Sequence, residues 1–358
     1  MRILHIISGD LWAGAETQAY LLLKALREEK SLEVEAMLFN EGILHDRLED
    51  LGIEVHLVKE QTGFVKMVKD SKKSTDRKPP DLVVSHGYKE AFIAYALKRK
   101  YKAKFITMYH GLSEVYSGFK QIKSSIFLCL QSFLARYISD GIITISNTLA
   151  SELSFLDLEK QFTVLNCAQV SGETRSKSDK ESKAKIVIVG RLVPIKRVDI
   201  AIKAMLGVKI DAVLDIVGDG PEEENLRLIA KQTELDNKIK FLGFRKDAGS
   251  LIANADLLLL SSDHEGVPTV ILEAASSGVP IVCTKLAGIQ EALSKLIDYP
   301  VFYGEKGSVD SFEEAINEAF DKHPPGVSLN KSPEFEKWFT PKAVARQHIE
   351  IYKSLNEV

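Results

Sequence analysis

The sequence has few cysteines and lacks the common metal-binding motifs. Its three cysteines, Cys129, Cys167 and Cys283, are far apart and odd in number. This excludes a disulfide framework and the usual zinc spacings, and it favours a reducing compartment. No Asp-x-Asp sequence occurs, and His264 has no partner histidine at ligand spacing. We therefore expect no bound metal and no other cofactor.

Long apolar runs and a strong charge of one sign are also absent. No stretch of about 18 apolar residues occurs, so the sequence predicts no membrane-spanning helix. The apolar start, residues 1–10, is too short for a signal peptide, and the cytoplasm is the expected compartment. Lysine and arginine number 47 against 50 acidic residues. This balance excludes nucleic-acid binding through bulk charge.

Two glycine-rich turns lack the standard nucleotide-binding fingerprints. Gly9–Glu16 follows the first expected strand, but Ala15 and Glu16 stand where a Walker A loop needs Lys and Ser or Thr. That turn also lacks an early G-x-G, and Gly218–Pro221 has no third glycine in register. A P-loop ATPase and a nicotinamide oxidoreductase are therefore disfavoured. The first turn either binds an anion through backbone amides or is a tight strand-to-helix connection.

The length of 358 residues suits about two domains. Short apolar runs alternate with helical patterns, which predicts an α/β fold with parallel sheets covered on both faces. A polar segment, residues 171–184, interrupts the alternation and is the expected linker between domains 1–170 and 185–338. A final helix is expected within 339–358. The expected strands are 2–7, 33–39, 54–58, 81–85, 104–108 and 141–145, then 185–189, 212–217, 238–242, 256–260 and 279–283.

The segment after strand 256–260 carries the sharpest signal. Glu265 lies in a loop, Gly266 lets the backbone approach a ligand closely, and Pro268 fits the first position of a helix. Glu273 then lies more than one turn into that helix. Two carboxylates and free amides can bind the vicinal hydroxyls of a ribose or hexose. The alternative is that the glutamates only stabilise the helix start.

Other polar side chains follow expected strands. Arg191 and Lys196 come after strand 185–189, and a guanidinium with an ammonium suits a diphosphate, although loop cations are commonly just solvated. His86 and His110 each follow a strand and precede a glycine, so both are expected to project from strand ends. For His86 a structural role is the alternative.

Taken in order, the carboxyl-half motifs resemble those of glycosyltransferase family 4. The resemblance is dense in that half and thin in the amino half, where Ala13–Glu16 is similar to the family's Gly-Gly-Ala-Glu loop. At Leu165–Ala168 the chain departs from the Pro-Asn-Gly of many relatives. The motifs are Gly190-Arg191…Lys196, Gly218-Asp219-Gly220-Pro221, Phe241-Leu242-Gly243-Phe244, Glu265-Gly266-x-Pro268…Glu273, Gly278–Val282 and Gly288…Glu291.

The resemblance implies the GT-B fold, with two Rossmann-like domains and a C-terminal helix that packs back on the first. It also implies retaining, metal-independent sugar transfer from a UDP- or GDP-sugar to a saccharide or lipid-linked acceptor. The amino-terminal domain would bind the acceptor. The implied catalytic residues are Glu265, His110, Arg191 and Lys196, with His86 on the acceptor side. The implied donor-binding residues are Gly14, Arg191, Lys196, Gly218, Phe244, Arg245, Glu265, Gly266, Val267, Pro268 and Glu273.

Within these implied roles, Glu273 would hold the ribose hydroxyls and Glu265 the donor sugar. Arg191 and Lys196 would bind the diphosphate. Two other functions stay open: a GT-B nucleotide-sugar epimerase, which needs no acceptor, and a noncatalytic sugar-nucleotide-binding protein. Titration with UDP, GDP and NAD would distinguish these sugar-nucleotide-binding proteins from a nicotinamide oxidoreductase.

A basic region extends from Lys66 to Lys104. Between Phe64 and Lys104 the chain holds twelve basic and four acidic residues, and the apolar Val65 lies beside the charges. The segment Val115–Tyr137 is amphipathic. Together, the two segments predict contact with an anionic membrane surface on the cytoplasmic side. The alternative is a solvated basic face and an ordinary helix that packs on the core.

Overall fold

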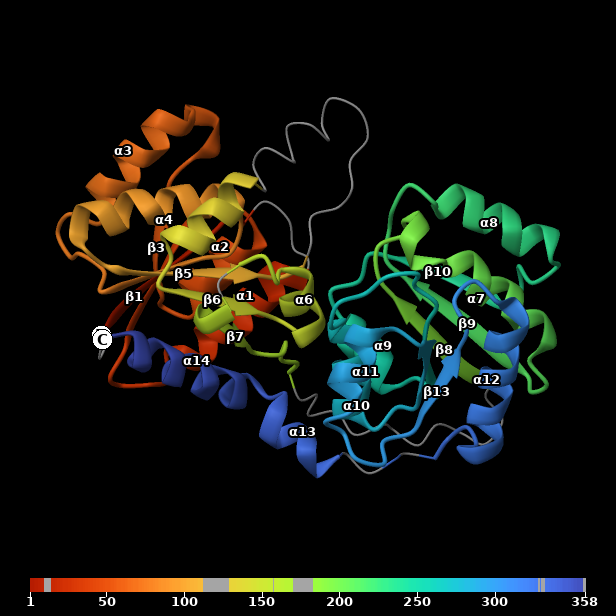
Figure 1. The fold of residues 1–358 in the computed structure, drawn as a ribbon. Coiled ribbons are helices and arrows are strands. Elements are labelled where there is room, and N and C mark those ends of the chain that lie inside the picture. Colours follow the sequence, from red (N-terminus) through yellow and green to blue (C-terminus); the bar gives the residue numbers. More distant parts are fainter. Residues whose placement is uncertain are drawn as a thin grey trace. The chain divides into compact units, whose positions relative to one another are not determined.

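The computed structural model describes residues 1–9, 14–111, 129–156, 158–169, 183–327, 329 and 332–356. The chain forms two compact units, one of Met1–Cys167 with Pro341–Val358 and the other of Ala168–Thr340. Each unit contains one parallel sheet with helices around it (Figure 1). The predicted class, α/β with two Rossmann-like sheets, is confirmed. The expected linker, 171–184, lies almost wholly outside the described residues.

The amino-terminal unit has a seven-stranded sheet in the order β3-β2-β1-β4-β5-β6-β7. All strand pairs given for it are parallel, and every strand expected in this half is present. Only the short β7 was not predicted. The strands are β1 (Arg2–Ile7), β2 (Glu33–Leu38), β3 (Glu54–Leu57), β4 (Leu82–Ser85), β5 (Lys104–Tyr109), β6 (Gly141–Thr144) and β7 (Gln161–Thr163).

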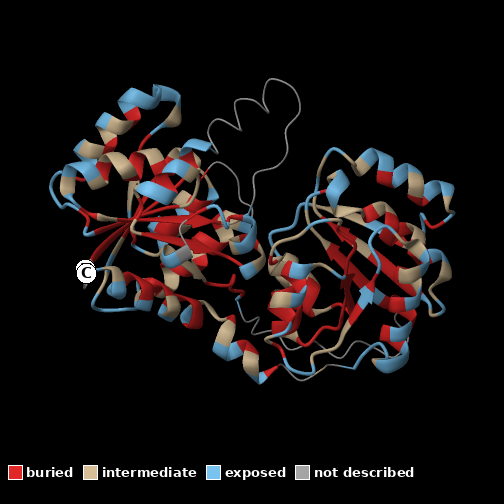
Figure 2. Ribbon diagram, viewed as in Figure 1, coloured by how far each residue is buried: buried red, intermediate tan, exposed pale blue. Residues whose placement is uncertain are grey.

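Helices cover this sheet, whose central strands are buried (Figure 2). All six residues of β1 are buried, as expected for a central parallel strand. The last helix, α14, packs against α1, and Tyr352 of α14 is fully buried in the same core as Ile3 of β1. The helices are α1 (Gly14–Leu26), α2 (Ile43–Asp50), α3 (Phe64–Ser74), α4 (Tyr88–Tyr101), α6 (Asn147–Glu152) and α14 (Pro341–Asn356).

The second unit has a six-stranded parallel sheet in the order β10-β9-β8-β11-β12-β13. The five strands expected in this half are present, and β13 is additional. The strands are β8 (Ala184–Val189), β9 (Ala212–Val217), β10 (Ile239–Gly243), β11 (Leu257–Leu260), β12 (Ile281–Thr284) and β13 (Val301–Gly304).

Helices of this unit follow ordinary helix rules. In α12 the side chain of Ser308 accepts a hydrogen bond from the Ser311 amide, which caps the first turn. Phe312, Ile316 and Phe320 then recur at helical spacing and face the core. The helices are α7 (Val198–Ala204), α8 (Glu223–Gln232), α9 (Ala248–Ala253), α10 (Thr269–Ser277), α11 (Ala287–Leu293), α12 (Val309–Lys322) and α13 (Pro333–Trp338).

Both sheets have a point where the strand order reverses. In the first sheet β1 lies between β2 and β4, and in the second β8 lies between β9 and β11. Connections on either side of such a point run to opposite faces of the sheet, and this leaves a crevice beyond the carboxyl ends of the strands. Functional side chains are therefore expected in the loops that follow β1, β4, β8 and β11.

The chain passes from one unit to the other at Cys167 and Ala168. The Gln18 side chain of α1 donates to the Cys167 carbonyl at 2.7 Å and accepts from its amide at 2.8 Å. In the second unit the Ala168 amide donates to the Phe339 carbonyl at 2.9 Å. These bonds fix the backbone at the place where the chain passes from one unit to the other.

Candidate functional site

The loops after β8 and β11 are joined by a charged contact. Nζ of Lys196 lies 2.6 Å from Oε1 of Glu265, and the Ser262 hydroxyl donates to the same oxygen at 2.6 Å. The Lys196 side chain is 28% exposed and that of Glu265 is 10% exposed. The structure thus brings together two predicted site residues that are 69 positions apart. Ser262 is a contact that the sequence reasoning missed.

The loop that carries Lys196 is held in an uncommon conformation. Arg197 has a φ of 48°, in the left-handed region that non-glycine residues rarely adopt. Its guanidinium binds Asp199 at 3.0 Å and Asp263 at 3.2 Å, while the Ser261 hydroxyl donates to its carbonyl at 2.8 Å. Contacts from both loops therefore fix the position of the neighbouring Lys196.

Two glycines let the loops after β8 and β9 lie in direct contact. A Cβ placed on Gly218 would lie 1.9 Å from the Gly190 carbonyl oxygen, and one on Gly220 would lie 2.3 Å from that of Leu192. The Leu192 amide donates to the Asp219 carbonyl at 2.7 Å. The G-x-G sequence at this turn thus serves close backbone packing.

The loop after β11 continues into α10, which begins at Thr269. Pro268 is the residue before the helix, with extended backbone angles, so the expectation that it occupies the first helical position was wrong by one residue. Proline cannot donate a hydrogen bond and suits this boundary equally well. Val267 is buried, whereas Gly266 and Pro268 remain partly exposed.

Gly288, at the start of α11, sets the position of this loop. A Cβ at Gly288 would lie 2.2 Å from the Gly266 carbonyl oxygen and 3.1 Å from that of Glu265. These neighbours are backbone atoms, so a side chain at Gly288 can be accommodated only if the loop moves. The position of Glu265 therefore depends on a glycine from the next strand-to-helix connection.

We expect Gly288→Ala to lower catalytic turnover by about 10²-fold, because a shift of about 1 Å in a positioning loop has an effect of that size. Gly249→Ala in α9 is the matched control, since a Cβ there meets no atom within 4 Å. Release of free nucleotide from a sugar nucleotide, the donor that the resemblance implies, measures both variants. Turnover equal to wild type in Gly288→Ala would show that the loop position is unimportant.

Glu273, on α10, is a carboxylate that forms no ion pair with any residue that the structure describes. It is partly buried, and burial raises its pKa above the usual value. Within the described part of the chain, its carboxylate makes no hydrogen bond or ion pair. A partly desolvated carboxylate gains from hydrogen-bond donors, and hydroxyl groups of a ligand supply them without a second charge.

The remaining predicted residues of this unit lie in loops that follow strands. Arg191 is exposed in the loop after β8. Phe244, which follows β10, is 52% exposed. Arg245 is exposed and binds Asp247 at 2.7 Å. All three follow the carboxyl end of a strand, as the ligand-binding prediction requires.

In the amino-terminal unit the structure brings His86 and His110 together. Their nearest ring nitrogens are 2.8 Å apart and the rings are stacked. His86 also contacts His5 of β1, at 2.9 Å between nitrogens. His5 was not predicted, and its one signal in the sequence is a histidine inside an apolar strand. Gly14 begins α1, and residues 10–13 of its predicted loop lie outside the described residues.

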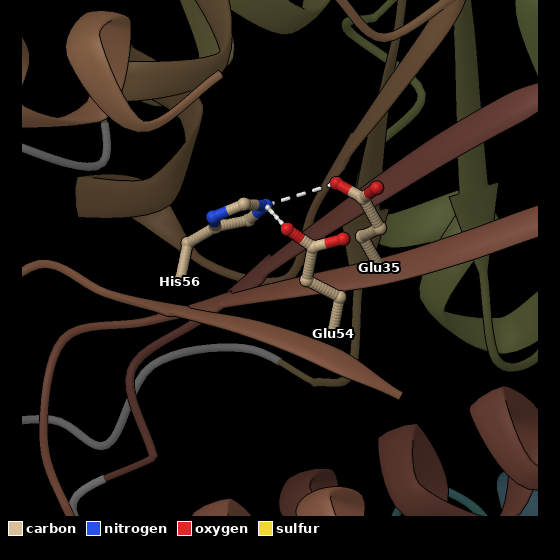
Figure 3. A group of neighbouring side chains, drawn as sticks. All are labelled: Glu35, Glu54 and His56. Carbon is tan, nitrogen blue, oxygen red and sulfur yellow. Dashed lines mark hydrogen bonds and ion pairs between the residues drawn. The ribbon is translucent and has the colours of Figure 1, made fainter. Parts of the chain in front are cut away.

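A second charged cluster lies on β2 and β3 of the amino-terminal unit. Figure 3 shows Glu35 of β2 with Glu54 and His56 of β3, whose potential metal-ligating atoms all lie within 4.8 Å of one another. Arg2 donates to one oxygen of Glu35 at 2.8 Å, and His56 lies 2.9 Å from the other. Because both oxygens are engaged and Arg2 is a cation, we interpret the cluster as a buried ion-pair network.

Two family models match the chain. The model described as Glycosyltransferase Family 4 matches residues 12–167, and the model described as Glycosyl transferases group 1 matches residues 171–331. Together they cover most of both units.

Curated relatives and solved structures agree with this match. The N-acetyl-alpha-D-glucosaminyl L-malate synthase of Bacillus anthracis is 27% identical over 59% of this chain and 58% of its own length. The lipopolysaccharide core biosynthesis glycosyltransferase LpsE of Rhizobium meliloti is 29% identical over 42% of this chain and 46% of its own. The chain thus spans about half the length of these curated relatives.

Among solved structures, HepE of Anabaena in complex with UDP has a TM-score of 0.83 and 21% identity, and it covers 99% of this chain and 100% of its own. At that identity the likeness shows the fold alone. HepE was also solved with UDP-glucose, with a TM-score of 0.80 and 20% identity, covering 100% of both chains.

Proposed function

Since the chain belongs to glycosyltransferase family 4, we propose that it transfers a sugar from a nucleotide diphosphate donor to a saccharide or lipid-linked acceptor in glycoconjugate biosynthesis. The arrangement that carries the proposal is the contact between Lys196 and Glu265 in the loops after β8 and β11, at the reversal point of the second sheet, with Glu273 in the helix that follows. UDP is the first nucleotide to test, because HepE binds UDP and UDP-glucose.

Each residue has a role that follows from its chemistry. Glu273 would accept hydrogen bonds from the ribose hydroxyls, and Glu265 from hydroxyls of the donor sugar. Lys196 and Arg191 would bind the diphosphate. The amides around Gly266 would line the sugar and phosphate, and exposed Phe244 and Arg245 would lie near the base.

The reaction we propose retains the anomeric configuration. The bond between the anomeric carbon and the diphosphate oxygen breaks, and the acceptor oxygen forms its bond on the same face of the sugar. The acceptor proton passes to the departing phosphate oxygen. Lys196 and Arg191 stabilise the negative charge that develops on the diphosphate, and this is the contribution that cations make in place of a metal ion.

Calorimetric titration with UDP, GDP and NAD tests the proposal. We expect UDP or GDP to bind and NAD to give no heat. Glu273→Gln should weaken nucleotide binding by about 10- to 100-fold, because hydrogen bonds to a charged group contribute about 1.5–3 kcal/mol. Glu318→Gln, at an exposed position of α12, is the control. Binding of NAD, or of no nucleotide, would contradict the proposal.

We also propose that α3 contacts an anionic membrane surface. Phe64 is 52% and Val65 is 84% exposed at its start, and Lys66, Lys69 and Lys73 are exposed along it. Four other cations of the basic region are paired, since Lys78 binds Glu33, Lys89 binds Glu60, Lys98 binds Asp140 and Lys100 binds Asp76. The exposed lysines of α3 therefore bring positive charge beside the exposed Phe64 and Val65.

This surface predicts binding to anionic vesicles at low salt that weakens at high salt. Lys66→Glu with Lys69→Glu should abolish it, since each basic residue near such a surface contributes about 1 kcal/mol. Lys30→Glu, an exposed position of the same unit, should not. Absence of pelleting at low salt would contradict the proposal.

No helix among the described residues has the length and apolar character needed to cross a membrane. Residues 115–128 of the predicted amphipathic segment lie outside the described residues.

A further inference from the structure

Three histidines form a continuous hydrogen-bonded chain in the amino-terminal unit. His110 follows β5, His86 follows β4, and His5 lies inside β1. Nε2 of His110 lies 2.8 Å from Nδ1 of His86, and Nε2 of His86 lies 2.9 Å from Nδ1 of His5. The chain therefore runs from a partly exposed strand end into the core, where His5 is 0% exposed.

All three imidazoles are neutral around neutral pH. Burial, with a contribution from His348, lowers the pKa of His5 to about 3, and burial lowers that of His110 to about 4. Burial and the neighbouring histidines hold the pKa of His86 well below its usual value. A neutral imidazole has one nitrogen that donates and one that accepts. The direction of donation at one histidine therefore fixes the direction at the other two.

His5 determines this direction, because its second nitrogen is buried without a hydrogen bond from any described residue. A buried N–H without an acceptor is rarer in proteins than an unpaired acceptor. His5 therefore carries its proton on Nδ1 and donates to His86. His86 in turn donates from its own Nδ1 to Nε2 of His110.

We propose that His5 and His86 are positioning residues that hold His110 in the tautomer protonated on Nδ1. In this tautomer His110 offers its ligand a hydrogen-bond donor, suited to a sugar or phosphate oxygen, and does not act as a base. Nε2 of His110 is engaged by His86, and Nδ1 has no partner within the described residues. The effect on catalysis rests on the proposed function, whereas the tautomer is a property of the free protein.

Two-bond ¹H–¹⁵N correlation spectra of histidine-labelled full-length protein distinguish protonated from unprotonated ring nitrogens and need no substrate. We expect His110 to be protonated on Nδ1 and to stay neutral until the pH approaches about 4. In His5→Phe the signals of His110 should shift towards a mixture of both tautomers. In His5→Asn, whose amide stands near the position of Nδ1, the wild-type pattern should return.

His110 protonated on Nε2 in the wild type, or a His110 tautomer unchanged in His5→Phe, would overturn the proposal. A thermal melt shows whether each variant is folded. If His5→Phe does not fold, the spectrum of His5→Asn still tests the proposal. For turnover, we expect kcat of His5→Phe to fall by about 10- to 100-fold, as it does when a group that orients a metal-ligating histidine is removed. His5→Asn should recover most of this loss.

The two readouts separate the two ideas. If no sugar nucleotide is a substrate, the proposed function fails, and the spectra still decide the tautomer. If the protein transfers sugar and folded His5→Phe has the kcat of the wild type, the positioning role is overturned.

Discussion

Lys196→Ala should lower turnover by about 10²–10³-fold, the loss typical of removing one group that stabilises developing negative charge. Lys196 is held beside Glu265 at 2.6 Å by a loop that contacts from Arg197 fix in place. In the proposed mechanism its ammonium faces the diphosphate as that group leaves. Release of free nucleotide, from the sugar nucleotide that the titrations select, is the measurement.

Lys322→Ala is the control for this variant. Lys322 belongs to the same unit and binds Glu318 at the exposed end of α12, so its removal should leave turnover unchanged. Lys196→Ala should still bind the nucleotide, but more weakly than the wild type does. Turnover equal to wild type in Lys196→Ala would show that this residue does not stabilise the diphosphate.

Glu35→Gln should destabilise the amino-terminal unit by about 3–5 kcal/mol, because it leaves the buried Arg2 without a counter-charge. The Arg2 and Glu35 side chains are only 9% and 3% exposed. Hydrogen exchange of the β1 and β2 amides reports the free energy of unfolding of this unit. A decrease below 1 kcal/mol would contradict the assignment of a buried ion pair.

The effect of Glu35→Gln should depend on pH. Burial raises the pKa of Glu35, but hydrogen bonds from His56 and Arg2 outweigh it and hold the pKa below the usual value. A carboxylate of this kind stabilises the folded state above its unfolded-state pKa, and the stabilisation is lost as the pH falls through the folded-state value. The difference between wild type and Glu35→Gln should therefore shrink in acid. Glu33→Gln, in an exposed pair with Lys78, should change stability by less than about 1 kcal/mol.

Much of the fold could be predicted because its strands are near-continuous apolar runs with helical patterns between them. The two strands that were missed are short and lie at sheet edges, where burial is incomplete. β7 has only partly buried residues, and β13 has one exposed residue, Tyr303. A run of three or four residues with mixed burial has too little periodicity to be distinguished from a loop.

The sequence indicated which residues belong to the candidate site, but not which of them contact one another. The order of motifs indicated Lys196 and Glu265, and the structure brings them together. The steric role of Gly288 and the hydrogen bond from Ser262 depend on backbone positions that no spacing encodes. His5 was not predicted because a single histidine in an apolar strand is usually a core residue whose hydrogen bonds are made within the protein. Its partner His86 is 81 positions away.

The central claim is that a nucleotide diphosphate binds beyond β8 and β11, with Lys196 at the diphosphate and Glu273 at the ribose. A crystal structure of the protein with bound UDP-sugar tests this most directly. We expect the Glu273 carboxylate within hydrogen-bonding distance of the ribose hydroxyls and the Lys196 ammonium beside a phosphate oxygen. A nucleotide bound elsewhere, with Glu273 facing solvent, would contradict the account.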